Sequence, residues 1–249
     1  MVIRTFLLFT CIILQTQPVS AQETAENVIK QAIKAAGYPT DKKAYHQTWK
    51  EQGKLSLGGV TLPYDAKWYY EPASKFRFEM KAEFQGQKMD VLFIHNGNKA
   101  KETMNGNHQM LQGEKLEESN YSAYVFWVNS LMPLVEEKGF TLKHLGDKEF
   151  AGKPVTSVQV SREGYRDMTL HFDRKTHLLA GCSDRVKDEA QGWKEVPQET
   201  EYFDYVKQPN GEMMFTGMRV KRNGQLLLES KLSDNKRIDG FKPELFKID

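Results

Sequence analysis

Residues 75–84 read KFRFEMKAEF, and apolar and charged side chains alternate through the whole stretch. Because successive side chains of a β-strand point to opposite faces of a sheet, this pattern predicts a strand with one apolar and one charged face. Burial on one face only is typical of antiparallel sheets. The stretch therefore indicates an antiparallel β protein.

The same two-residue period continues through most of the chain, between short turns. Asn-Gly pairs at 96–97, 105–106 and 223–224 are strong hairpin signals. Turn signals recur every 8–12 residues or so, and this rhythm predicts a mainly β fold of about 10–11 strands. We expect the polar stretch 186–197 to be a connection that precedes the strand at 202–206.

Two segments instead show the 3.6-residue period of an amphipathic helix. The first covers residues 24–36 and places an alanine, valine and isoleucine stripe on one side. Thr24 is a suitable N-cap, and Gly37 ends the helix.

The second helical segment covers residues 120–134. Ser119 or Asn120 can cap its start, and Pro133 marks its end or a kink. An amphipathic helix must bury its apolar stripe against another element. We therefore predict one domain, residues 22–249, in which two or three amphipathic helices cover the concave face of a large, curved antiparallel half-barrel.

The first 21 residues have the organisation of a signal peptide. Arg4 supplies a positive charge, residues 6–14 form an apolar core, and small residues precede cleavage after Ala21. A core of about nine residues is much shorter than the ~20 needed to span a bilayer. A retained membrane anchor and a lipid anchor on Cys11 are the alternatives. We expect a periplasmic protein whose mature chain has no transmembrane span.

The charge of the chain is nearly balanced, with 35 Lys and Arg residues, of which only Arg4 lies in the first 21, and 33 Asp and Glu residues. This balance argues against a nucleic-acid partner and against an anionic membrane surface. After cleavage Cys182 is the single cysteine, so no internal disulfide is possible. We interpret Cys182 as a small strand residue, and we expect a monomer.

No catalytic motif stands out. The chain has no HExxH, GxSxG, P-loop or CxxC sequence. His171 and His177 flank a predicted hairpin and could meet near Asp173 as a metal site, although solvated or turn histidines are the simpler interpretation. A paired carboxylate acid and base stays open, but no pair is evident. We expect no enzymatic activity, no metal and no cofactor.

The apolar residues are rich in types that suit an adaptable cavity, with 10 Met and 14 Phe. Methionine is flexible and polarizable, and a sheet covered by few helices tends to leave a pocket. An ordinary packed core is the alternative interpretation. If the alternation has the opposite sense, all the predicted strand positions fail together. The residues that we predict to line an apolar cavity are Phe76, Phe78, Met80, Met89, Val91, Phe93, Tyr124 and Val128.

The order of these elements resembles the LolA-like family of periplasmic lipoprotein carriers, which sort lipoproteins to the outer membrane. The resemblance runs over most of the mature chain and depends on the order of weak motifs. These are the helix at 24–36, WYYEPASKFRF at 68–78, LFIHNGN at 92–98, the helix at 120–134, FDRKTHLL at 172–179 and DGFKPELF at 239–246.

The resemblance implies a curved half-barrel with a helical lid, a cavity for lipid or for the acyl chains of a lipoprotein, and partner proteins at two membranes. The chain departs from the family pattern in two places. Glu71 stands where the family carrier has a basic residue before the proline, so that role is not transferred, and Lys99-Ala100-Lys101 replaces a frequent aromatic.

These considerations predict an exported carrier or chaperone for an apolar cargo. A sensory or protein-binding module on the same fold is the second hypothesis, and an envelope hydrolase is the third.

Overall fold

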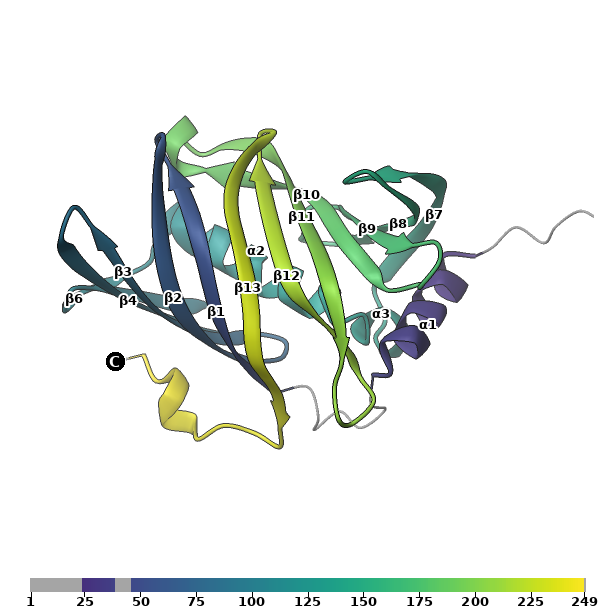
Figure 1. Ribbon diagram of the computed structural model, residues 1–249, viewed down its shortest axis with the longest axis horizontal. Coiled ribbons are helices and arrows are strands. Elements are labelled where there is room, and N and C mark those ends of the chain that lie inside the picture. Colours follow the sequence, from purple (N-terminus) through teal and green to yellow (C-terminus); the bar gives the residue numbers. More distant parts are fainter. Residues whose placement is uncertain (1–23, 39–45, 249) are drawn as a thin grey trace, which may run out of the picture.

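A single antiparallel sheet dominates the computed structural model, which describes residues 24–38 and 46–248 (Figure 1). The described part of the chain contains 13 strands in the spatial order β6-β5-β4-β3-β2-β1-β13-β12-β11-β10-β9-β8-β7. The strands are β1 His46–Leu57, β2 Val60–Glu71, β3 Lys75–Phe84, β4 Gln87–Asn96, β5 Lys99–Met104, β6 Asn107–Met110, β7 Phe140–Phe150, β8 Lys153–Arg162, β9 Met168–Asp173, β10 Leu179–Asp188, β11 Lys194–Lys207, β12 Met213–Arg222 and β13 Gln225–Ile238. The mainly β prediction is thus confirmed, with an open, curved sheet.

The connectivity of the sheet explains where the helices lie. Strands β1 to β6 follow one another outward from the centre, and β7 to β13 return from the opposite edge until β13 pairs with β1. The chain must therefore travel from edge strand β6 to edge strand β7. It does so through α2 (Gly113–Asn129) and α3 (Pro133–Glu136), which lie across the concave side of the sheet (Figure 1).

The first helix matches its prediction closely. Helix α1 spans Ala25–Ala36, and the Thr24 hydroxyl accepts a hydrogen bond from the Asn27 amide at 3.2 Å. Gly37 closes the helix in the left-handed conformation, which glycine adopts without a steric penalty. The buried stripe of α1 packs into the main core.

The second helix begins seven residues before the predicted start at residue 120, and neither Ser119 nor Asn120 caps it. Its first turns are polar, so the apolar stripe does not mark them. Ion pairs hold this part instead, with Lys115 2.9 Å from Glu189 and Lys187 2.7 Å from Glu117. Pro133 begins α3 and does not end the long helix.

Two predictions about the strands were wrong. The sheet has 13 described strands where 10–11 were expected, and part of the difference is the short, exposed β6. The stretch 186–197 is a hairpin and not a connection: β10 reaches Asp188, the 3₁₀ turn Glu189–Gln191 follows, and β11 begins at Lys194. Backbone pairing and the Arg185–Glu195 ion pair support this hairpin, and its one buried valine pair, Val186 and Val196, is too short a pattern to reveal it in the sequence.

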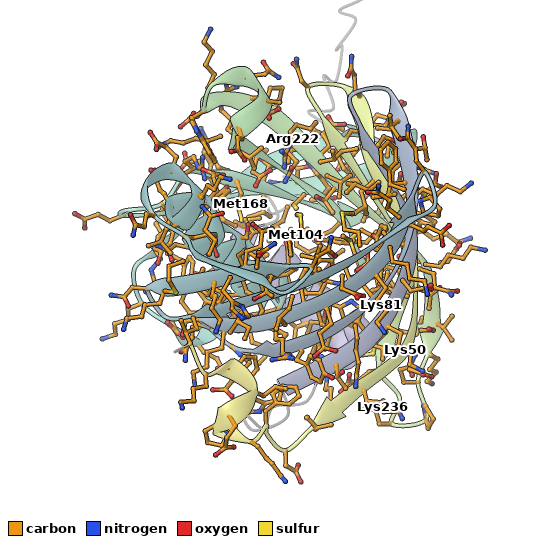
Figure 2. All side chains as sticks on the ribbon, turned by 90° about the vertical axis from the view of Figure 1, so that its left-hand side faces the viewer. Lys50, Lys81, Met104, Met168, Arg222 and Lys236 are labelled. Atoms are coloured by element: carbon orange, nitrogen blue, oxygen red, sulfur yellow. The ribbon has the colours of Figure 1, made fainter. Side chains whose placement is uncertain are left out.

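The two faces of the sheet differ in polarity, as residues 75–84 predict. Lys50, Lys81 and Lys236 lie on the outer, convex side, whereas Met104 and Met168 lie within the curve (Figure 2). The main core fills the concave side beneath α1, α2 and α3 and uses residues of β8 to β11. Within the described residues, no helix is both long enough and apolar enough to cross a bilayer.

Candidate ligand cavity

An apolar cavity of about 420 Å³ lies between helix α2 and the concave face of the sheet. Small-molecule sites commonly have volumes of roughly 300–1,000 Å³, so the space suits a ligand. Its floor comes from β1, β2 and β10 to β13, and one side of α2 forms its roof. The lining includes Tyr38, Trp49, Glu51, Trp68, Tyr70, Tyr121, Val125, Phe126, Asn129, Leu179, Asp184, Val186, Gln198, Tyr202, Tyr205, Met213, Met214, Phe215, Met218, Arg222, Leu228, Leu232, Asn235 and Arg237.

Aromatic rings make one wall of the cavity. Trp49 and Trp68 stack across β1 and β2 with ring centroids 5.5 Å apart, and Phe126 of α2 meets Trp68 edge-on at 5.6 Å. The methionines of β12, Met213, Met214 and Met218, contribute flexible side chains to another part of the lining. A wall of rigid rings together with flexible thioethers can adapt to a flexible apolar chain.

The six predicted strand residues belong to the neighbouring part of the concave face and do not line this cavity. Phe76, Phe78 and Phe93 pack against Trp68 and Phe126, and the centroids of Trp68 and Phe78 are 4.4 Å apart. Met80, Val91 and Met89 belong to a separate small cluster with Tyr64 and Ala66. The alternation therefore has the predicted sense, but the residues pack beside the cavity wall on the same face of the sheet.

The two predicted helix residues face the other way. Tyr124 and Val128 are buried in the main core, and the Tyr124 ring stacks on Tyr165 at 3.9 Å. The neighbouring positions Val125 and Asn129 line the cavity. One side of α2 thus packs into the main core and the adjacent side lines the cavity. The 3.6-residue period does not distinguish the residues of these two sides.

Glu51 is a buried carboxylate on the apolar face of β1, with both of its oxygens engaged. Oε1 accepts a hydrogen bond from the Tyr64 hydroxyl at 2.5 Å, and Oε2 accepts one from Trp68 Nε1 at 2.6 Å. Gly53 makes this possible, because a Cβ at that position would lie 2.6 Å from the Tyr64 hydroxyl oxygen. The network fixes the orientation of the indole that forms the cavity wall.

Asp184 is a second buried carboxyl group on the lining, only 8% exposed. Burial raises the pKa of Asp184 from 3.8 to about 6, against the opposing effects of Tyr121 and Arg166. Tyr121 faces Asp184, yet neither its hydroxyl nor Asp184 Oδ2 makes a hydrogen bond of full geometry. The Arg166 guanidinium lies 3.8 Å from the centre of the Tyr121 ring and pairs with Glu118 at 2.7 Å.

A buried ion pair closes the opposite end of the cavity. Arg237 Nε donates to Glu212 Oε2 at 2.5 Å, and the Arg237 guanidinium lies 5.1 Å from the centre of the Tyr38 ring. Burial raises the pKa of Tyr38, so its hydroxyl stays protonated. This arrangement links β13, the β11–β12 hairpin and the segment after α1.

The histidines do not form the metal site that the sequence left open. His171 is 1% exposed and is hydrogen bonded to Ser157 at 2.9 Å and Ser183 at 2.8 Å, whereas His177 is exposed in a turn. Burial lowers the pKa of His171 to about 3, so it is neutral. Among the described residues, no three His, Cys, Asp or Glu side chains are grouped to hold a metal ion. Cys182 is buried, and its pKa is raised to about 12.

Two lining residues leave a signal in the sequence that the search for motifs missed. Glu51 interrupts the apolar series Trp49, Gly53 and Leu55 on β1, and Asp184 follows Cys182 on the buried face of β10. A carboxylate at an apolar position of a strand is costly unless it is compensated, so it marks a specific environment. Glu51 and Asp184 are both carboxyl groups at apolar strand positions, and both line the cavity.

Comparisons with solved structures support the fold. A LolA superfamily protein from Nitrosomonas europaea superposes with a TM-score of 0.57 at 9% identity, over 91% of this chain and 98% of that protein. An outer membrane lipoprotein-sorting protein domain from Vibrio parahaemolyticus gives a TM-score of 0.55 at 12% identity, over 89% and 97% of the two chains. A DUF1329 family protein from Desulfovibrio piger gives a TM-score of 0.57 at 11% identity, over 90% and 98%.

The chain thus has the fold of the LolA superfamily, as the order of its sequence motifs indicated. No family model matches the sequence, and no curated protein does. At identities of 9–12% the likeness describes the architecture alone.

Proposed function

We propose that the protein is an exported carrier or chaperone that holds an apolar cargo, a lipid or the acyl chains of a lipoprotein, between helix α2 and the sheet. The observation that carries the proposal is the apolar cavity of about 420 Å³ beneath α2. The organisation of residues 1–21, which lie outside the described residues, supports export to the periplasm after cleavage at Ala21. The lipoprotein-sorting fold supports the cargo class.

Burial of methylene groups provides the driving force in this proposal. Each buried CH₂ contributes about 0.8 kcal/mol, so a long acyl chain needs no covalent attachment. The environments of Glu51 and Cys182 also suit a binding protein better than a catalyst. Both oxygens of Glu51 accept hydrogen bonds, and the Cys182 thiol is protonated, so neither residue is poised as a base or nucleophile.

Thermal unfolding of residues 22–249 with and without a long-chain amphiphile tests the proposal. A ligand present at one hundred times its Kd stabilises the folded state by about 2.7 kcal/mol and raises Tm. Val125→Trp fills the space beneath α2 and should abolish the ligand-induced increase in Tm. The matched control is Val135→Trp, because Val135 of α3 is exposed and does not line the cavity.

If the amphiphile leaves the Tm of the wild-type protein unchanged, the carrier proposal is rejected. If Val125→Trp and Val135→Trp respond alike, the ligand binds elsewhere.

A protein-binding module is the second candidate, and the edge strand β6 favours it. All four residues of Asn107–Met110 are exposed, and their outer backbone edge can accept a strand from a partner. This function predicts that the protein binds a polypeptide and that amphiphiles do not change its stability.

A further inference from the structure

Several polar atoms on the wall of the cavity have no hydrogen-bond partner within the described structure. Buried donors and acceptors in proteins are almost always satisfied, because an unpaired one carries its full desolvation cost. Their position on an otherwise apolar surface suggests that a ligand or ordered water completes them. The atoms that belong to lining residues are Tyr70 Oη, Tyr121 Oη, Asn129 Oδ1, Asp184 Oδ2 and Asn235 Oδ1.

Three of these residues lie along one seam, where α2 crosses β10. Tyr121 and Asn129 both line the cavity, and their eight-residue separation on α2 corresponds to about 12 Å along the helix axis. Tyr121 faces Asp184. Asn129 Nδ2 lies 3.7 Å from the sulfur of Cys182, the residue two positions before Asp184 on β10.

The seam has more free acceptors than free donors. Carbonyl and carboxylate oxygens only accept, and the amide nitrogen of Asn129 already donates to the Tyr202 hydroxyl at 2.9 Å. The nearby Arg222 donates from Nε and Nη2 to Gln198 Oε1. The free donor among these three residues is the Tyr121 hydroxyl, which faces Asp184, so one donor stands against the two acceptors Asn129 Oδ1 and Asp184 Oδ2. A group that completes the seam must therefore bring at least one further O–H or N–H donor.

The charges around the seam favour a neutral donor. Asp184 and Glu118 are matched by Arg166 and Arg222, all of which affect the pKa of Asp184. An ammonium group would bring a third cation into this balanced cluster. A phosphate would place further acceptors against Asn129 Oδ1 and Asp184 Oδ2. A hydroxyl group donates a hydrogen bond and adds no charge.

We infer that Tyr121, Asn129 and Asp184 form a polar subsite that binds the hydroxyl groups of an amphiphilic cargo. This inference rests on the proposed function, because the apolar part of the same molecule occupies the cavity between Val125 and the Trp49–Trp68 wall. Both Tyr121 and Asp184 are more than nine-tenths buried, so the subsite is reached only through that cavity.

The test compares three probes with sixteen-carbon chains and different polar ends. Monopalmitoylglycerol offers hydroxyl groups, methyl palmitate offers only acceptors, and hexadecyl phosphate offers an anion. Their Kd values are measured by titration calorimetry on the delipidated mature chain at pH 7. We expect monopalmitoylglycerol to bind about tenfold more tightly than methyl palmitate, the effect of a hydrogen bond to a charged group.

Two variants locate the preference. Tyr121→Phe and Asp184→Asn keep the shape of their side chains, and each should reduce the preference for monopalmitoylglycerol about fivefold while leaving methyl palmitate binding unchanged. Tyr165→Phe is the matched control, because Tyr165 is exposed and does not line the cavity. Near-ultraviolet circular dichroism verifies that each variant is folded.

The possible outcomes separate the two proposals. Equal binding of monopalmitoylglycerol and methyl palmitate by the wild-type protein would overturn the subsite and leave the carrier function intact. Tighter binding of hexadecyl phosphate would overturn the donor chemistry. A protein that binds none of the three probes has neither the subsite nor the proposed function.

Discussion

The apolar concave face is covered to different extents at the two ends of the sheet. Strands β7 to β10, the closed half, lie beneath the helices, and their inward residues Val158, Val160 and Leu170 have no exposed surface. Strands β1 to β6, the open half, have only small apolar clusters. Met104, paired with the inward residue Val91, is 44% exposed there.

One continuous sheet thus combines a packed base, the closed half, with a binding surface at the edge of the open half. Helices α1 and α3 and the inner side of α2 fill the closed half. Of these three helices, α2 is the one that reaches toward the open half, where Phe126 contacts Trp68 and Tyr70. The cavity lies at the boundary, where helical cover ends before the apolar face does.

Truncating an inward side chain should give the largest difference in stability loss between the two halves. Leu170→Ala removes a fully buried side chain from the closed half and should lower the free energy of unfolding by about 3–4 kcal/mol. Met104→Ala in the open half should change it by less than about 0.5 kcal/mol, because the side chain is already exposed. Urea denaturation measures both, and equal losses would contradict the division into two halves.

Acid should destabilise both halves, each through a buried histidine. Burial lowers the pKa of His171 from 6.5 to about 3 and that of His95 to about 4. A base with a lowered folded pKa resists protonation, so the folded state loses stability as pH falls below 6.5. Between pH 6.5 and 4 the loss through His171 should be on the order of 3 kcal/mol.

The measurement is the free energy of unfolding against pH for the wild type and His171→Gln. The variant should lose less stability than the wild type over this range. Parallel curves would show that His171 does not carry the acid sensitivity.

Asp184 at the boundary should have the opposite pH dependence. Its pKa is raised to about 6, so the folded state binds the proton more tightly than the unfolded chain, and this contribution grows as pH falls from about 6 to 3.8. At pH 7 the buried charge costs on the order of 3 kcal/mol. Asp184→Asn should therefore raise Tm at pH 7 and have little effect at pH 4. A lower Tm at pH 7 would contradict the account of Asp184.

Apart from the comparison variant Met104→Ala, the smallest effect is expected in the open half at Gly53. A Cβ there would lie 2.6 Å from the Tyr64 hydroxyl oxygen, so Gly53→Ala should displace the ring that binds Glu51 and cost about 1–2 kcal/mol. Tryptophan fluorescence should also change, because Glu51 binds Trp68. The control Gly86→Ala lies in a turn with no atom nearby, and its fluorescence should match the wild type.

The fold could be predicted from the sequence because its determinants are local. The alternation at residues 75–84 places each side chain on the correct face, and Thr24 with Gly37 bounds α1 correctly. The hairpin of β10 and β11 could not be predicted in this way. Val186 and Val196 pair within the main core, but Asp184 takes the preceding inward position of β10 and interrupts the apolar period. The residues beyond this pair are held by backbone pairing and charge.

The site could be predicted only in part, because it depends on the path of α2. Trp68 and Phe78 are direct cross-strand partners on the same face, yet only Trp68 lines the cavity. Sequence alternation predicts only that both residues face the concave side. The choice between them comes from where α2 crosses the sheet, and this is a property of the whole chain.

Native mass spectrometry of the mature chain, residues 22–249, purified from its own envelope and followed by lipid extraction tests the central claim most directly. The account predicts a stoichiometric acyl-containing species in the wild-type protein that is absent from folded Val125→Trp and retained in Val135→Trp. A protein that carries no acyl species and also fails to bind added monopalmitoylglycerol would contradict the claim that the cavity beneath α2 holds an apolar cargo.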